Sequence, residues 1–165
     1  MKQKIVLSKF ASLLTAFVFV LLFAGCFLNF HDKRLFFILL AIYIGLVLAG
    51  LFYGTLYVKA DSDHIFLGSP LRSHKLNMRD VESVELFQPT MGAIRLFASG
   101  GFMGYWGLYR EGDIGRYYAF YGKASDCFIV RMKDGGQYVL GCENPRELAD
   151  YISSHMNLCK RSGGL

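Results

Sequence analysis

Two long apolar runs open the chain. Residues 10–30 read FASLLTAFVFVLLFAGCFLNF and residues 35–58 read LFFILLAIYIGLVLAGLFYGTLYV, and neither run contains a charged residue. As helices rising about 1.5 Å per residue, they would be about 31 and 36 Å long, enough to cross a hydrocarbon core of about 30 Å. Only HDKR lies between them. The pattern predicts a transmembrane hairpin of two helices, at about 10–30 and 35–58, within an N-terminal segment of residues 1–58.

From residue 59 onward the apolar runs become strand-length and are separated by turn residues. The segment DSDH separates LYVKA from IFLG and predicts a hairpin at the membrane exit. Further strands are expected in VESVELF, which has an edge-like alternation, and in AIRLFA, RYYAFYG, CFIVRM and QYVLGC. Residues 59–165 are therefore expected to form a second, sheet-rich domain.

The clearest hairpin joins CFIVRM to QYVLGC across KDGG. A two-residue turn would place Cys127 opposite Cys142 and would invite a disulfide. A three-residue turn at 134–136 instead puts the apolar side chains on one face: Phe128, Val130, Met132, Tyr138, Leu140 and Cys142. Because register follows the hydrophobic pattern, we expect the second arrangement, with the two cysteines on opposite faces and no disulfide.

A helix is predicted at about 145–157. Asn144 can cap it, Pro145 suits the first helical position, and Glu147 completes a capping box. Leu148, Tyr151 and Ile152 then recur at helical spacing. This amphipathic helix needs a sheet to cover.

The charge is distributed unevenly along the 165-residue chain, which is 53% hydrophobic and 19% charged. Of the net charge of +5, residues 1–58 hold five Lys or Arg against one acid, and residues 59–165 hold thirteen against twelve. A near-neutral sheet domain lacks the basic surface that a phosphate backbone requires, which excludes nucleic-acid binding.

The basic residues also predict the orientation in the membrane. Lys2, Lys4 and Lys9 precede the first run, and Lys59, Arg72 and Lys75 follow the second, whereas the connecting loop has only Lys33 and Arg34. We expect a multi-pass protein of the bacterial cytoplasmic (inner) membrane with both termini in the cytoplasm.

Small residues in the second run allow two packing arrangements. Gly50 and Gly54 form a GxxxG pair, which permits close helix contact in lipid. These glycines could form a homodimer seam, or they could pack within the chain, as the short loop between the helices favours.

The triplet AGC at residues 24–26 offers an alternative for the whole protein. A basic start and an apolar stretch before Cys26 resemble a lipoprotein signal, in which Cys26 would be lipidated and become the new N-terminus. The residues after it, CFLNF, remain apolar where a lipoprotein normally turns polar. We therefore expect a membrane span and keep an envelope lipoprotein lipidated at Cys26 as the alternative.

Glycines and aromatics alternate in GGFMGYWGLY, residues 100–109. The stretch lacks the Lys-Ser/Thr of a phosphate-binding P-loop. Its aromatic residues are Phe102, Tyr105, Trp106 and Tyr109. They could contact a partner protein or the membrane interface, or they could fill the core of a small barrel.

No catalytic or metal-binding pattern emerges. The cysteines have no CxxC or CxxH spacing, and no G-x-S-x-G elbow occurs. The acids and histidine of the DSDH turn are ordinary turn residues. We expect a protein without catalytic residues, metal or cofactor.

Five segments carry a resemblance to a known family: the run HKLNMRDVESVEL, the glycine-rich middle, the strand RYYAFY, the hairpin KDGG and the helix start NPREL. Together they resemble the bacterial pleckstrin-homology-like (PH-like) domain proteins, which often carry two N-terminal membrane helices. The resemblance covers about residues 55–157. It implies a bent antiparallel sheet or barrel closed by one C-terminal helix, and a membrane-attached module that binds lipid or protein without catalysing a reaction.

One departure from the family bears on its ligand. Phosphoinositide-binding PH domains carry Lys and Arg around the first inter-strand loop, where this chain has KADSDH with Asp61 and Asp63. Two acids would repel a phosphorylated headgroup there. The expected function is a non-enzymatic integral membrane protein whose cytoplasmic domain docks a membrane or cytoplasmic protein, or binds at the surface of the lipid bilayer.

Overall fold

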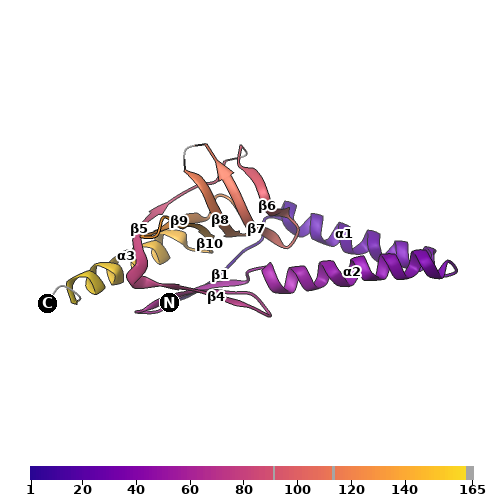
Figure 1. The fold of residues 1–165 in the computed structure, drawn as a ribbon, viewed down its shortest axis with the longest axis horizontal. Helices are drawn as coiled ribbons and strands as arrows, with labels where there is room; N and C mark the ends of the chain where they lie inside the picture. Colours follow the sequence, from indigo (N-terminus) through magenta and orange to yellow (C-terminus); the bar gives the residue numbers. More distant parts are fainter. Residues whose placement is uncertain (91, 113, 163–165) are drawn as a thin grey trace.

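Two apolar helices project from a sheet-rich domain that a third helix closes at its far end (Figure 1). The computed structural model describes residues 1–90, 92–112 and 114–162. The helices lie side by side and return the chain to the end at which it entered. Residues before the first helix and after the second therefore lie in the same domain.

The two helices are α1 (Lys9–Leu28) and α2 (Lys33–Tyr53). The Ser8 side chain caps α1 by accepting a hydrogen bond from the Ala11 amide, and the Asp32 carboxylate caps α2. Both predicted helices are confirmed, but α2 does not reach residue 58. It ends at Tyr53 because Gly54 adopts an extended conformation and the chain enters a strand soon afterwards.

The apolar surface of this hairpin is almost entirely uncovered by the rest of the chain. Only 6% of the most apolar window of each helix is buried, which differs from the core helices of soluble proteins. Both helices are long and apolar enough to cross a membrane.

In the residues that the structure describes, the strands form two sheets. The smaller sheet has the order β1-β2-β3-β4, with β1 (Lys2–Lys4), β2 (Tyr57–Ala60), β3 (His64–Gly68) and β4 (Ser73–Asn77). A short 3₁₀ turn, η1 (Met78–Asp80), leads to the larger sheet. Its order is β5-β9-β10-β8-β7-β6, with β5 (Val81–Leu86), β6 (Ile94–Gly101), β7 (Gly104–Glu111), β8 (Gly115–Tyr121), β9 (Cys127–Met132) and β10 (Gln137–Gly141).

The larger sheet departs from the fully antiparallel arrangement expected. Strand β10 runs parallel to β8, with Tyr138 opposite Tyr118. The chain leaves β8, passes over one strand position to form β9, and returns as β10 into the position between them. The predicted edge strand β5 does lie at one edge of this sheet.

The β9–β10 hairpin confirms the predicted division of its faces. Its three-residue turn begins one residue earlier than expected: the Met132 amide donates to the Gly136 carbonyl at 2.8 Å, and Gly135 takes a φ of 85°. This shift moves the register by two residues and so leaves each side chain on its predicted face. Cys142 belongs to the main core and Cys127 to a second cluster on the other face, and both are free thiols.

The main core lies between the two sheets and is closed by α3 (Pro145–Ser162), which extends beyond the predicted residue 157. Leu148 and Ile152 of α3 are fully buried against Val81 and Phe128 of the larger sheet and Val58 of the smaller one. The predicted apolar stripe of the helix is therefore the face that covers the core. Its contacts with β5, η1, β9 and β2 place it across one end of the layered sheets.

The N-terminal strand β1 was not expected. It pairs with β2, with Lys2 opposite Lys59, so the smaller sheet takes strands from both sides of the predicted boundary at residue 58. The same segment also contacts the larger sheet: the Lys4 carbonyl accepts from the Glu143 amide at 3.0 Å, and the Ser8 amide donates to the Gly122 carbonyl at 2.9 Å. Residues before α1 thus join the two sheets along one side.

This joint gives a first testable prediction. A Cβ on Gly122 would overlap the Val6 carbonyl oxygen, a backbone atom that cannot turn away, whereas a Cβ on Gly112 meets nothing within 4 Å. Gly122→Ala is expected to lower the free energy of unfolding by about 1–3 kcal/mol, the usual cost of overpacking. Urea denaturation in detergent measures it with Gly112→Ala as the control, and equal stability of the two variants would contradict the close contact.

Candidate functional site

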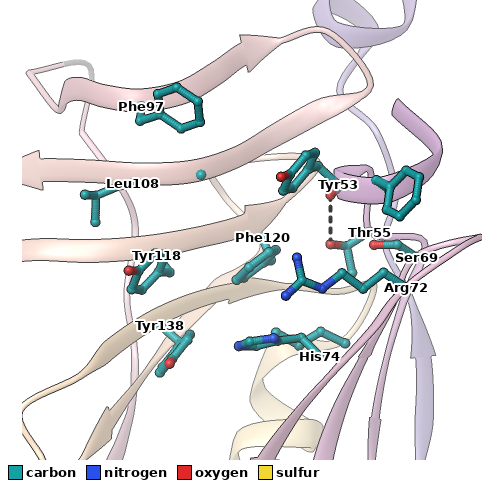
Figure 2. A pocket seen from close by; sticks show the side chains of 13 residues that line it. Tyr53, Thr55, Ser69, Arg72, His74, Phe97, Leu108, Tyr118, Phe120 and Tyr138 are labelled. Atoms are coloured by element: carbon teal, nitrogen blue, oxygen red, sulfur yellow. Dashed lines mark hydrogen bonds between the residues drawn. The ribbon is translucent and has the colours of Figure 1, made fainter. Parts of the chain in front are cut away.

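A pocket of about 500 Å³ lies between the two sheets, at the end of the domain next to α2 (Figure 2). Helix α3 fills the opposite end of this space. Because no helix closes the α2 end, side chains line a cavity there instead of meeting in a core. The lining residues come from α2 and the following residues, from both sheets and from the β3–β4 turn: Phe52, Tyr53, Thr55, Leu67, Ser69, Arg72, His74, Phe97, Gly107, Leu108, Tyr118, Phe120 and Tyr138.

One side of the pocket is aromatic. Tyr118 of β8 stacks on Tyr138 of β10 with ring centroids 5.6 Å apart. His74 of β4 lies across the gap, with its ring 6.2 Å from those of both Phe120 and Tyr138. The imidazole therefore spans the two sheets, and the tyrosine and phenylalanine faces form a flat apolar surface beside it.

The polar groups come mainly from the smaller sheet. Figure 2 shows Arg72 and His74 extending from that sheet toward the aromatic side chains of the larger one. Among the described residues, none of those that line the pocket is Asp or Glu. Burial of the imidazole, assisted by the charge of Arg72, lowers the pKa of His74. The fixed positive charge in the pocket is therefore that of Arg72.

The β3–β4 turn that carries Arg72 is held against the end of α2. The Leu71 amide donates to the Leu51 carbonyl at 3.2 Å, which satisfies one of the free carbonyls in the last turn of the helix. Within the turn, the Ser69 amide donates to the Arg72 carbonyl at 2.8 Å. The cationic side of the pocket and the end of the apolar helix are thus fixed together.

The four aromatics considered as partner contacts pack within the chain. Trp106 stacks on Tyr53 at 5.0 Å with an interplanar angle of 11°, and its indole N–H donates to the Phe102 carbonyl. The other three contact different rings: Phe102 lies 5.5 Å from Phe19, Tyr105 stacks on Tyr121, and the buried Tyr109 stacks on Tyr117. None of the four lines the pocket, although Trp106 contacts Tyr53, which does.

Gly50 and Gly54 contact the β6–β7 turn of the same chain. A Cβ on Gly50 would overlap the Met103 sulfur, and the Met103 amide donates to the Thr15 hydroxyl of α1 at 2.8 Å. The turn therefore lies against both helices near the sheet domain. A homodimer through these two glycines would require Met103 to move away.

Cys26 lies partly exposed near the end of α1 that is remote from the sheets. Cleavage before this residue would remove β1 and most of α1. The smaller sheet would then lose an edge strand, together with the hydrogen bonds from Lys4 and Ser8 to the larger sheet.

The acidic turn of residues 61–63 joins β2 to β3, at the opposite end of β3 from the turn that carries Arg72. There the Lys59 ammonium pairs with the Asp61 carboxylate at 2.8 Å, and the hydrogen bond from Lys59 lowers the pKa of Asp61. The acidic turn therefore lies at the other end of β3 from the pocket, and one of its two acids, Asp61, is paired with a lysine.

Across the described ranges, no three His, Cys, Asp or Glu side chains gather in a group that could hold a metal ion. The chain matches no protein-family model, and no curated protein and no solved structure is similar enough to count as a match.

The titration of His74 can be tested directly. Because its pKa is lower in the folded protein than the ordinary value of 6.5, the unfolded chain binds this proton more readily. The free energy of unfolding should therefore fall as the pH drops from about 6.5 through the lower folded pKa, and His74→Phe should reduce that fall while keeping a stacked ring.

Urea titrations of the detergent-solubilised protein at a series of pH values measure this slope. His64→Phe, which removes a histidine outside the pocket, is the matched control. An unchanged slope in His74→Phe would contradict a lowered pKa of the half-buried His74 imidazole.

Proposed function

We propose that this chain is a non-enzymatic, membrane-anchored binding protein that takes an amphiphilic ligand from the bilayer into the pocket between its two sheets. The observation that carries the proposal is the position of the pocket, which Phe52 and Tyr53 of α2 line on one side. An apolar chain leaving the lipid beside α2 would meet the aromatic surface of the pocket without crossing water. The apolar chain of the ligand would then not be exposed to water during the transfer, which is favourable.

The residues around the pocket support placing this end of the sheet domain at the membrane–water boundary. The stacked pair of Tyr53 and Trp106 lies at the sheet end of α2, and these residue types concentrate at the interfaces of a bilayer. Leu71 is 55% exposed in the turn that is hydrogen-bonded to α2. An exposed leucine at this level would gain burial in the lipid interface.

The cytoplasmic side is the proposed location of the domain. The chain enters and leaves the helical hairpin at the sheet domain (Figure 1). This arrangement supports placing both flanks of the hairpin on the same side of the membrane. The flanks hold the larger share of Lys and Arg, and this favours the cytoplasmic face of a bacterial inner membrane.

We retain the PH-like resemblance as part of the proposal. Two layered sheets closed at one end by a C-terminal helix support it. The parallel β8–β10 pair departs from the antiparallel sheet of that family, and the acidic turn removes its phosphoinositide site. The proposed binding site is the pocket at the other end of β3.

Docking of a protein is the second candidate function. Strand β6 forms one edge of the larger sheet, and Ile94 and Phe97 are 61% and 82% exposed along it. An exposed edge with apolar side chains is a template for an added strand from a partner. A partner strand on β6 would also cover Phe97 at the rim of the pocket.

Filling the pocket tests the first candidate. Leu108→Trp adds an indole ring to the pocket lining, and it should reduce the amount of lipid that co-purifies with the full-length protein by about tenfold, measured by native mass spectrometry. Leu86→Trp, at an exposed position of β5 outside the pocket, is the matched control. Equal lipid occupancy in the two variants would refute the pocket as the binding site.

A further inference from the structure

We propose that the ligand is a single-chain amphiphile with an anionic head, bound with its head at Arg72 and its chain along the aromatic surface. This inference rests on the proposed function and adds the chemical class of the ligand. Three properties of the pocket support it: an unpaired fixed charge, a volume that matches one chain and an apolar side that continues to the surface at Phe97.

The charge selects an anion. In the described part of the chain, the side chain of Arg72 is exposed at the pocket and has neither a hydrogen-bond nor an ion-pair partner. A guanidinium offers a planar fork of donors that matches a carboxylate or phosphate. Since none of the described residues that line the pocket is Asp or Glu, a bound anion would be attracted by Arg72 and not repelled by these neighbours.

Hydroxyl groups lie on the same side as the guanidinium. Ser69 precedes Arg72 in the β3–β4 turn, and Thr55 follows the end of α2 (Figure 2). The Thr55 hydroxyl makes only a long bond of 3.4 Å to the Tyr53 carbonyl, so it can reorient toward a ligand. An anionic head at Arg72 could thus accept additional hydrogen bonds.

The volume favours a ligand with a single chain. At about 30 Å³ for each water-sized group, 500 Å³ holds roughly 17 non-hydrogen atoms. This is the size of one long acyl chain with a carboxylate, and it is too small for a two-chain phospholipid. The flat faces of Phe120, Tyr118 and Tyr138 suit a chain that lies extended across them.

The distribution of polar and apolar lining gives the ligand a direction. Arg72 and His74 lie on the smaller sheet, while Phe97 and Leu108 line the side that belongs to β6 and β7. Phe97 is 82% exposed, so the apolar side of the pocket continues to the surface of the domain. A chain longer than the cavity could therefore leave past Phe97 while its head stays at Arg72.

The experiment uses the full-length protein in nanodiscs of zwitterionic lipid. Trp106 is the one tryptophan of the chain and stacks on Tyr53, which lines the pocket. Because quenching by probe in the bilayer is the same for every variant, the difference in quenching between the wild type and an Arg72 variant reports on ligands that enter the pocket. The probes are a fatty acid brominated along its chain, which quenches tryptophan on contact, and the fatty alcohol of the same chain and bromination. The expected result is that the wild type binds the acid at least tenfold more tightly than the alcohol.

Substitutions at Arg72 then assign that preference to the guanidinium. Arg72→Gln should weaken binding of the acid by roughly 10- to 100-fold, as expected for loss of a hydrogen bond to a charged group, and leave the alcohol unchanged. Arg72→Lys should keep part of the preference, and Arg79→Gln, in the exposed 3₁₀ turn, should keep all of it.

The outcomes separate this inference from the function on which it rests. Equal binding of acid and alcohol to the wild type, or an equal loss of both in Arg72→Gln, would overturn the anionic ligand and leave an apolar pocket. Binding of neither probe to the wild type would overturn the proposed function as well.

Discussion

The contact between the sheet domain and the ends of the two helices is the interaction on which the rest of the structure depends. The β6–β7 turn places Met103 against Gly50 of α2 and bonds to Thr15 of α1, and the β3–β4 turn bonds to the last turn of α2. Each sheet thus supplies one attachment. Because the two attachments lie on different sheets, they also fix the sheets relative to each other at this end of the domain.

The pocket follows from the way in which the domain is closed. Leu148 and Ile152 of α3 fill the space between the sheets at one end, and the residues before α1 join the sheets along one side. At the α2 end the sheets are held apart by the helices to which they attach. Aromatic and cationic side chains line that space, and their separation onto opposite sheets gives it one polar and one apolar side.

The sequence predicted those elements whose signal is local. Uncharged runs marked the helices, and alternation fixed the faces of β9 and β10 because register must put Phe128 and Leu140 in the core. The Asn144-Pro145 start of α3 was likewise readable. Strand β1 was missed, since three residues with two lysines carry no apolar alternation and are stabilised by pairing with residues 57–59.

The pocket could not be found in the same way, because its residues come from distant parts of the chain. Arg72 stood in a turn and served only to count charges for orientation. Nothing near it in sequence shows that it lacks an acidic partner or that it lines a pocket together with Tyr138 of another sheet. The glycines of the β6–β7 region drew attention instead to Trp106 and its neighbours, whose rings contact other rings of the same chain.

On the proposal that the helical hairpin spans a membrane, strand β1 makes the sheet domain a check on membrane insertion. Its residues leave the ribosome before either apolar helix, yet their partners in β2 are made only after both. The pairing can form only if the hairpin brings its two ends to the same side of the bilayer. In a chain inserted with one span missing, β1 would lie on the opposite side of the membrane from β2. The edge of β2 would then be unpaired, and the incomplete sheet would be exposed to aggregation or proteolysis. With the hairpin in a membrane as proposed, folding of the domain would therefore report whether the helices have been inserted correctly.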